Sequence, residues 1–169
     1  MNYLKEILRL IHILGAMYWF GAALMMYYFV SPTVAATGDA GQKFGSYLGG
    51  KSGLGKSMLV TSIASAVAGA WLYWINSNGM QSAWMTSSSG IVFGLGGIFG
   101  AIALTFGFIV NRTIAAMGRL GAQIQGKPTP EQVGQMQSLQ ARNAKAFRIT
   151  TYTIIISAVC MAGARFFIV

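Results

Sequence analysis

Four long apolar stretches divide this chain, and they constrain its fold more than any other feature of the sequence. They cover residues 7–30, 57–75, 90–110 and 147–169. Each is long enough to cross the ~30 Å hydrocarbon core of a bilayer at about 1.5 Å per residue. Lipid offers the backbone no hydrogen-bonding partner, so each stretch must be a helix. The sequence therefore predicts an all-α fold, a polytopic membrane four-helix bundle, with residues 1–169 in a single integral membrane domain.

The charge composition agrees with this prediction. Only 9% of the residues are charged, whereas a soluble domain has about 25%. There are 12 Lys and Arg residues against 3 Asp and Glu residues, which gives a net charge of +9. In a soluble protein this excess would suggest nucleic acid. Here the basic residues lie between the apolar stretches, where they report topology and contact with anionic lipid head groups. We therefore expect the lipid bilayer as a partner, and no nucleic acid.

The distribution of the basic residues predicts that both termini lie outside. Loops on the cytoplasmic side of a membrane are enriched in Lys and Arg. With the N-terminus outside, nine of the 12 basic residues fall on the cytoplasmic side, and only Lys5, Arg9 and Arg165 remain outside. The segment at residues 76–89 would then be external, and it carries no charge.

The connection between the first two stretches contains a motif that resembles a phosphate-binding loop. Pro32 lacks a backbone N–H and is expected to end the first helix. A polar, glycine-rich cytoplasmic connection at residues 31–56 would follow. Its end, GKSGLGKS at residues 50–57, matches the pattern GxxxxGK[ST]. That pattern binds nucleotide where a buried strand precedes it, and no strand is predicted here. We expect no nucleotide, but a basic turn that meets lipid phosphates, with the next helix starting near Ser57.

The third and fourth helices are predicted to extend beyond the membrane as a cytoplasmic hairpin. Apolar residues continue at helical spacing from the third stretch to Ile124. Gly126 suits a helix C-terminus. Thr129, Pro130 and Gln132 form the pattern of a capping box with proline at the first helical position. The fourth helix is therefore expected to begin near Pro130, well before its apolar part.

Small residues predict where the helices pack, because close approach in lipid depends on them. The second and third stretches contain two such sets: Ser62, Ala66, Gly69 and Ala70 in one, and Gly90, Gly94, Gly96, Gly97 and Gly100 in the other. We expect the second and third helices to be in close contact. The alternative is that two copies of the chain meet there. A homo-oligomer or a larger membrane complex is the expected assembly.

His12, the only histidine, is the main candidate site residue. An ionisable residue within a membrane span is a functional hypothesis by default. Arg165 is the other such residue, and Arg9 lies one helical turn before His12 on about the same side. With both termini outside, His12 and Arg165 are expected at a similar shallow depth near the outer surface.

These three residues allow two readings. His12 could bind haem or a metal ion, and Arg9 and Arg165 could receive an anion such as a haem propionate. Alternatively, the two arginines extend to the surface and His12 hydrogen-bonds a neighbouring helix. No carboxylate is predicted beside His12 except Glu6 at the surface. A general acid–base pair is therefore missing, and we expect no catalytic residue.

Short motifs carry a resemblance to known proteins. The segment HILGAMYWFG at residues 12–21 resembles the opening of small bacterial membrane proteins that include the CopD-like copper-resistance proteins and the HemJ-type protoporphyrinogen oxidases. The segments FVSP at 29–32 and MAGARF at 161–166 resemble uncharacterised members of that group. The resemblance implies four helices in a bacterial cytoplasmic (inner) membrane and contact of His12 with haem b or copper. The chain departs from the HemJ type at residues 87–93, SSSGIVF, where those enzymes have a lysine. It departs from the CopD type in having a single imidazole.

Three functions remain open at this point. The main hypothesis is a non-enzymatic integral membrane subunit or accessory protein of an energy-transducing or haem-handling complex. The first alternative is a haem-binding redox membrane protein with His12 as an axial ligand. The second is a copper or metal-ion permease. The cofactor is left open, with haem b as the candidate.

Overall fold

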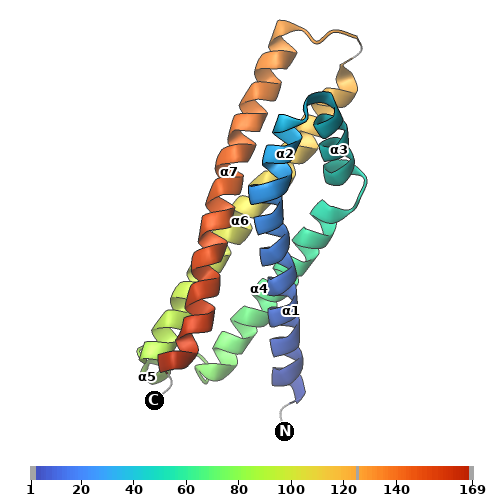
Figure 1. Cartoon of the computed structure of the whole chain (residues 1–169). Coiled ribbons are helices and arrows are strands. Elements are labelled where there is room, and N and C mark those ends of the chain that lie inside the picture. Colours follow the sequence, from blue (N-terminus) through green and yellow to red (C-terminus); the bar gives the residue numbers. More distant parts are fainter. Residues whose placement is uncertain (1–2, 125, 168–169) are drawn as a thin grey trace.

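The computed structural model describes residues 3–124 and 126–167, and throughout these ranges the chain forms helices and the turns that join them. Four helical segments are long and apolar enough to cross a membrane: Tyr3–Ala36, Leu54–Asn76, Ser88–Gln123 and Pro130–Phe166. The predicted all-helical class and the four apolar helices are confirmed. The molecule is elongated, and the two ends of the chain lie at the same end of it (Figure 1).

The first segment is longer than predicted, and Pro32 does not end it. Helix α1 (Tyr3–Met25) continues through a π-helical turn, η1 (Met26–Val30), into α2 (Ser31–Ala36). In the π turn the N–H of Ser31 donates to the carbonyl of Met26, five residues back. This wider turn changes the hydrogen-bond register just before Pro32. In a regular α-helix the proline ring would clash with the backbone carbonyl four residues earlier. The proline is therefore accommodated within the helix.

The glycine-rich connection is also helical. Helix α3 (Gly38–Gly50) turns back beside α2, and α4 (Leu54–Asn76) begins after a turn at residues 51–53. Gly38 and Gly53, at the two turns, have positive φ angles of 54° and 76°. The next helix thus starts three residues before Ser57, near the predicted position, and most of the connection at residues 31–56 is helical.

The helices associate in two pairs (Figure 1). Helix α1 packs along α4, and α6 (Ser88–Gln123) packs along α7 (Pro130–Gly163). The short α5 (Ser82–Met85) precedes α6, and a 3-10 turn, η2 (Ala164–Phe167), follows α7. The expected contact between the second and third helices exists, since Gly94 of α6 faces Tyr73 of α4. It is smaller than the contact within either helix pair. Gly96 of α6 instead faces Cys160 and Met161 of α7.

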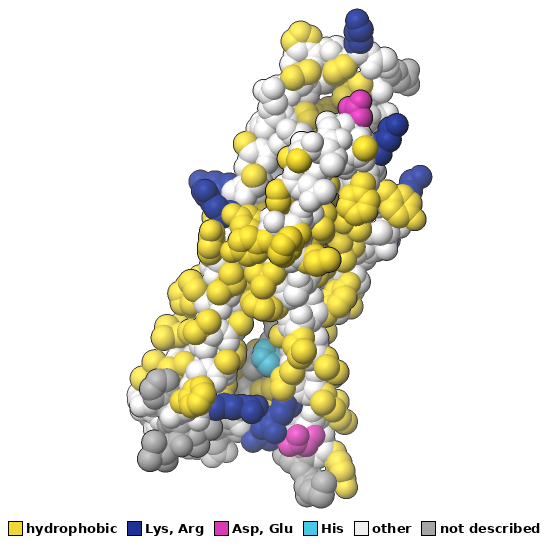
Figure 2. Space-filling view, viewed as in Figure 1, with side chains coloured by type: hydrophobic (Ala, Val, Ile, Leu, Met, Phe, Trp, Pro, Cys, Tyr) yellow, Lys and Arg dark blue, Asp and Glu magenta, His cyan; other side chains and the backbone are white. Residues whose placement is uncertain are grey.

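The two pairs meet at a small core. Trp19, Ala103 and Ile154 are buried there, from α1, α6 and α7, and Phe20, Met58 and Leu104 pack against them. Most large apolar side chains point outward instead, and Figure 2 shows them over much of the molecule's length. Contiguous apolar surface of this extent is rare on soluble monomers and marks a surface that lipid or protein covers.

The far ends of α6 and α7 lie side by side beyond the start of α4 (Figure 1). The hydroxyl of Thr113 donates to Asn143 Oδ1 across this pair at 2.8 Å. The capping box is confirmed: Thr129 accepts from the N–H of Gln132, and Gln132 accepts from the N–H of Thr129. Gly126, between the two helices, has a φ of 86°. The fourth helix begins at Pro130, as predicted.

Candidate functional site at His12

His12 joins α1 to α4 through a reciprocal pair of hydrogen bonds. Its Nδ1 lies 2.8 Å from the carbonyl oxygen of Ser65. The hydroxyl of Ser65 in turn donates to the carbonyl of His12, also at 2.8 Å. A carbonyl can only accept, so we assign the imidazole proton to Nδ1. The side chain of each residue thus bonds the backbone of the other, and the two helices are held in a fixed register.

This assignment determines what the rest of the ring can do. With the proton on Nδ1, the Nε2 atom of the neutral imidazole carries the lone pair. No hydrogen bond engages Nε2 within the part of the chain that the structure describes. The ring is half-buried, and Figure 2 shows it in a hollow between the two helix pairs. A histidine whose Nδ1–H donates to a backbone carbonyl is oriented as histidine ligands of haem and metals commonly are.

Glycines allow the two helices to come close enough for these bonds. A Cβ atom added to Gly69 of α4 would lie 2.7 Å from two atoms of the His12 ring. One added to Gly15 of α1 would lie 3.1 Å from the carbonyl oxygen of Thr61. Small residues at both positions are what close packing between apolar helices needs.

The face of α4 that meets α1 is a stripe of small and polar residues, one in every four: Ser57, Thr61, Ser65 and Gly69. Ser57 extends the polar contacts, since its hydroxyl hydrogen-bonds the hydroxyl of Tyr18 at 2.7 Å. Of the residues that the sequence suggested for contact with the third helix, which are Ser62, Ala66, Gly69 and Ala70, only Gly69 belongs to this stripe against α1. The regular spacing of four was the signal that could have shown the rest.

His12 lies beside the middle of α4. Its partner Ser65 is eleven residues from both Leu54 and Asn76, the ends of α4. The histidine is therefore level with the middle of this helix. Helix α1 begins at Tyr3, so His12 stands more than two turns from its start. The shallow position of His12 in a membrane stays a prediction.

The two arginines lie at the end of the molecule that carries both termini, but neither forms a hydrogen bond or ion pair with His12. Arg9 pairs with Glu6 at 3.4 Å on the exposed side of α1. Arg165 is exposed in η2, which packs against α6 and α7, and it makes no ion pair with the other described residues. Figure 2 shows basic side chains gathered below the histidine, at the lower edge of the hollow.

The fit of a metal or haem can be judged from these residues. Within residues 3–124 and 126–167 no group of three or more His, Cys, Asp or Glu side chains could hold a metal ion. Cys160 is half-buried against Gly96 between α6 and α7. His12 offers one nitrogen for an axial position of haem, and no second histidine exists in the chain. A haem would therefore have at most one histidine ligand from this chain.

The phosphate-loop pattern lies in a different setting from the one that binds nucleotides. Helix α3, not a strand, precedes it. The hydroxyl of Ser57, which would approach a magnesium ion in such a loop, bonds Tyr18 and the carbonyl of Leu54. Residues 50–57 therefore do not have the strand–loop–helix geometry of a nucleotide-binding phosphate loop.

Comparisons with known proteins add no relative. No protein-family model matches the chain, and neither a curated protein nor a solved structure matches it. The likeness to CopD-like and HemJ-type proteins thus rests on the short motifs alone.

Proposed function

We propose that the chain is a non-enzymatic integral membrane subunit or accessory protein, a helical scaffold with no reaction centre of its own. The observation that carries this proposal is the bonding of His12. The one histidine of the chain is engaged, through Nδ1 and its backbone carbonyl, in holding α1 against α4. No carboxylate hydrogen-bonds it among the described residues, so the partner that acid–base catalysis needs is missing.

In this proposal the four apolar helices form a bundle in a bacterial inner membrane, with both termini outside and the far ends of α6 and α7 in the cytoplasm. The distribution of charge supports the orientation. The α6–α7 hairpin carries five basic residues beyond the apolar stretches: Arg112, Arg119, Lys127, Arg142 and Lys145. The opposite end carries only Lys5, Arg9 and Arg165. Positive residues favour the cytoplasmic side.

The test is purification from native membranes in a mild detergent, through a C-terminal tag on the full chain. We expect one or more other membrane proteins to co-purify in a fixed ratio. The His12→Ala and Ser65→Ala variants should lose part of that assembly, because they loosen the α1–α4 pair. A chain that purifies alone and shows a catalytic turnover abolished by His12→Ala would contradict the proposal.

A second candidate, a haem-binding membrane protein, is favoured by one specific observation. Nε2 of His12 forms no hydrogen bond with the described residues, and the ring lies in the hollow between the helix pairs (Figure 2). Haem bound there would supply electron-transfer chemistry, and Arg9 and Arg165 lie toward the end where propionates would be neutralised. An absorption spectrum of the purified protein decides: a Soret band absent in His12→Ala but present in Arg119→Ala supports haem. A colourless protein after expression with excess haem excludes it. No observation favours the metal-ion permease.

A further inference from the structure

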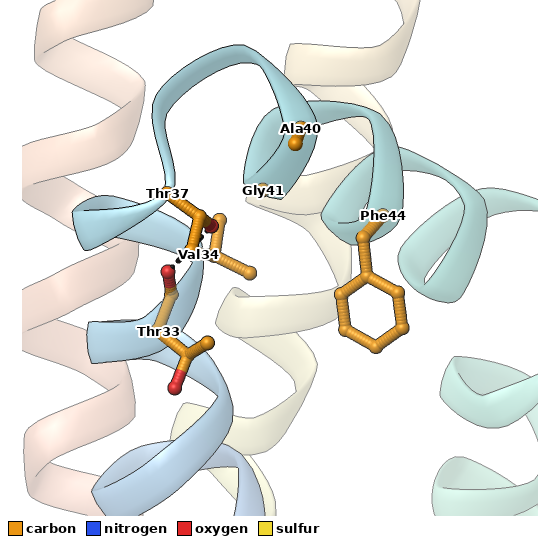
Figure 3. Close-up of a pocket in the computed structure, with 6 residues that line it drawn as sticks. All are labelled: Thr33, Val34, Thr37, Ala40, Gly41 and Phe44. Atoms are coloured by element: carbon orange, nitrogen blue, oxygen red, sulfur yellow. Dashed lines mark hydrogen bonds between the residues drawn. The ribbon is translucent and has the colours of Figure 1, made fainter.

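Helix α3 presents large aromatic side chains away from the rest of the molecule. Phe44 and Tyr47 are 54% and 61% exposed. They lie three residues apart and so share one face of the helix, and Lys51 lies four residues further, beside Tyr47. The ring of Phe44 projects from α3 at the edge of a pocket that Val34 and Thr37 also line (Figure 3). The aromatic residues of α3 therefore contribute little to the internal packing of the chain.

Glycines hold α3 in place against its neighbours. Gly41 is buried so closely against Val34 of α2 that a Cβ atom would overlap the Val34 carbonyl. A Cβ on Gly49 would lie 3.1 Å from Ile114 of α6. The helix is thus fixed to both neighbours through one face, and this contact sets the direction in which its aromatic residues point.

This aromatic face lies at the edge of the apolar part of the molecule. Helix α3 ends at Gly50, and the candidate membrane helix α4 begins at Leu54. Tyr47 and Lys51 therefore stand within about two helical turns of that start. Figure 2 shows basic side chains beside hydrophobic ones at this level, on the right-hand edge of the molecule. Aromatic and basic residues together mark the boundary between acyl chains and head groups.

The lysines around this face have no partner within the chain. The side-chain ammonium groups of Lys43, Lys51 and Lys56 form no hydrogen bond or ion pair with any residue that the structure describes. The one acid nearby in sequence is Asp39, at the opposite end of α3. Three unpaired ammonium groups next to two exposed rings are complementary to an acidic phospholipid, with its phosphate on the lysines and its acyl chains against the rings.

We propose that α3 is an interfacial anchor that binds acidic phospholipid through Lys43, Lys51 and Lys56, with Phe44 and Tyr47 inserted at the acyl boundary. This goes beyond the proposed function and rests on its placement of α4 in the membrane. The ligand chemistry is a lipid head group with net negative charge, such as phosphatidylglycerol. Zwitterionic phosphatidylcholine lacks that net charge and binds more weakly.

The experiment uses the full chain, purified in a neutral detergent, and native mass spectrometry with added phosphatidylglycerol or phosphatidylcholine. The triple variant Lys43→Gln, Lys51→Gln, Lys56→Gln should retain phosphatidylglycerol about 100-fold more weakly, at about five-fold per lysine. A matched control, Arg119→Gln, Lys127→Gln, Arg142→Gln, removes the same charge from the α6–α7 hairpin. It should change binding less than about three-fold, because the attraction falls off within a Debye length and the hairpin extends away from the membrane in the proposed orientation. Phe44→Ser with Tyr47→Ser should weaken the binding of both lipids.

Three outcomes would overturn the anchor. These are unchanged phosphatidylglycerol binding in the lysine variant, an equal loss in the hairpin control, and equal binding of the two lipids by the wild type. If the aromatic variants instead convert a dimer to a monomer without altering lipid binding, the face binds a second copy and the anchor is wrong. None of these results would alter the co-purification of partner subunits, so a failure here is distinguishable from a failure of the proposed function.

Discussion

The imidazole ring of His12 lies against the backbone of Gly69, so that a Cβ atom at Gly69 would stand 2.7 Å from both Nδ1 and Cε1 of the ring. The Gly69→Ala variant must therefore move the ring or separate α1 from α4. We expect a loss of about 1–3 kcal/mol in the free energy of unfolding, typical of overpacking. The measurement is unfolding of the detergent-solubilised protein in a mixed-micelle denaturant titration.

Gly97→Ala is the matched control for that variant. Gly97 also lies within a long apolar helix, but no atom is within 4 Å of the position of an added Cβ. Its substitution should leave stability unchanged or raise it by up to about 1 kcal/mol, through helix propensity. Equal destabilisation by the two substitutions would show that the contact between His12 and Gly69 is not the cause.

The hydrogen bonds between His12 and Ser65 should be energetically coupled. Ser65→Ala removes the hydroxyl that donates to the His12 carbonyl at 2.8 Å. Hydrogen bonds between membrane helices contribute about 0.6 kcal/mol on average, with a maximum near 1.7. We expect a loss in this range for Ser65→Ala, and less than the sum of the two single losses when it is combined with His12→Ala. Additive losses in this double-mutant cycle would mean that the two residues act independently.

The turn between α2 and α3 should depend on Gly41. An alanine there would place its Cβ against the hydroxyl of Thr37 and the carbonyl of Val34. We expect Gly41→Ala to detach α3 and to expose residues 38–53 to limited proteolysis at least about ten-fold faster, which corresponds to about 1.4 kcal/mol of local opening. Gly50→Ala, at the end of the same helix with no atom within 4 Å, should be cleaved like the wild type. Equal cleavage of all three proteins would contradict this account of the turn.

The proposed orientation can be tested with single cysteines in a Cys160→Ser background. Gln81→Cys, in the uncharged segment between α4 and α6, should react with a membrane-impermeant maleimide in intact cells. Ser138→Cys, on the exposed side of α7 beyond the apolar part, should react only after permeabilisation. The reverse pattern would place both termini in the cytoplasm and invert the topology.

Local signals in the sequence were sufficient for part of this structure. Hydropathy located the four long helices, and the capping residues Thr129 and Gln132 located the start of the fourth. Helix α3 could not be predicted in this way, because five of its 13 residues are glycine, which has a low helix propensity. Its helix is supported by contacts of Gly41 with Val34 and of Gly49 with Ile114, residues of other helices.

The candidate site was likewise predictable only in part. His12 stood out as an ionisable residue in an apolar stretch, a property that needs no knowledge of neighbours. Its partner Ser65 could not be identified in this way, because polar and small residues occur on several faces of α4. Only the packing of the helices shows that Ser65 and Gly69 face α1. The free Nε2 atom follows from the Ser65 contact and so could not be inferred without it.

The π turn at residues 26–30 has a consequence for the direction of everything that follows it. A π turn holds one more residue than the α turn it replaces, and one residue corresponds to about 100° of rotation about the helix axis. If the same residues formed a regular α turn with none deleted, α2, and α3 with it, would swing by about this angle around the axis of α1, whereas deleting one residue from Met26–Val30 would restore a regular helix and leave their direction nearly unchanged. The azimuth at which Phe44 and Tyr47 leave the molecule is therefore set by the wide turn that absorbs this extra residue, one turn before Pro32.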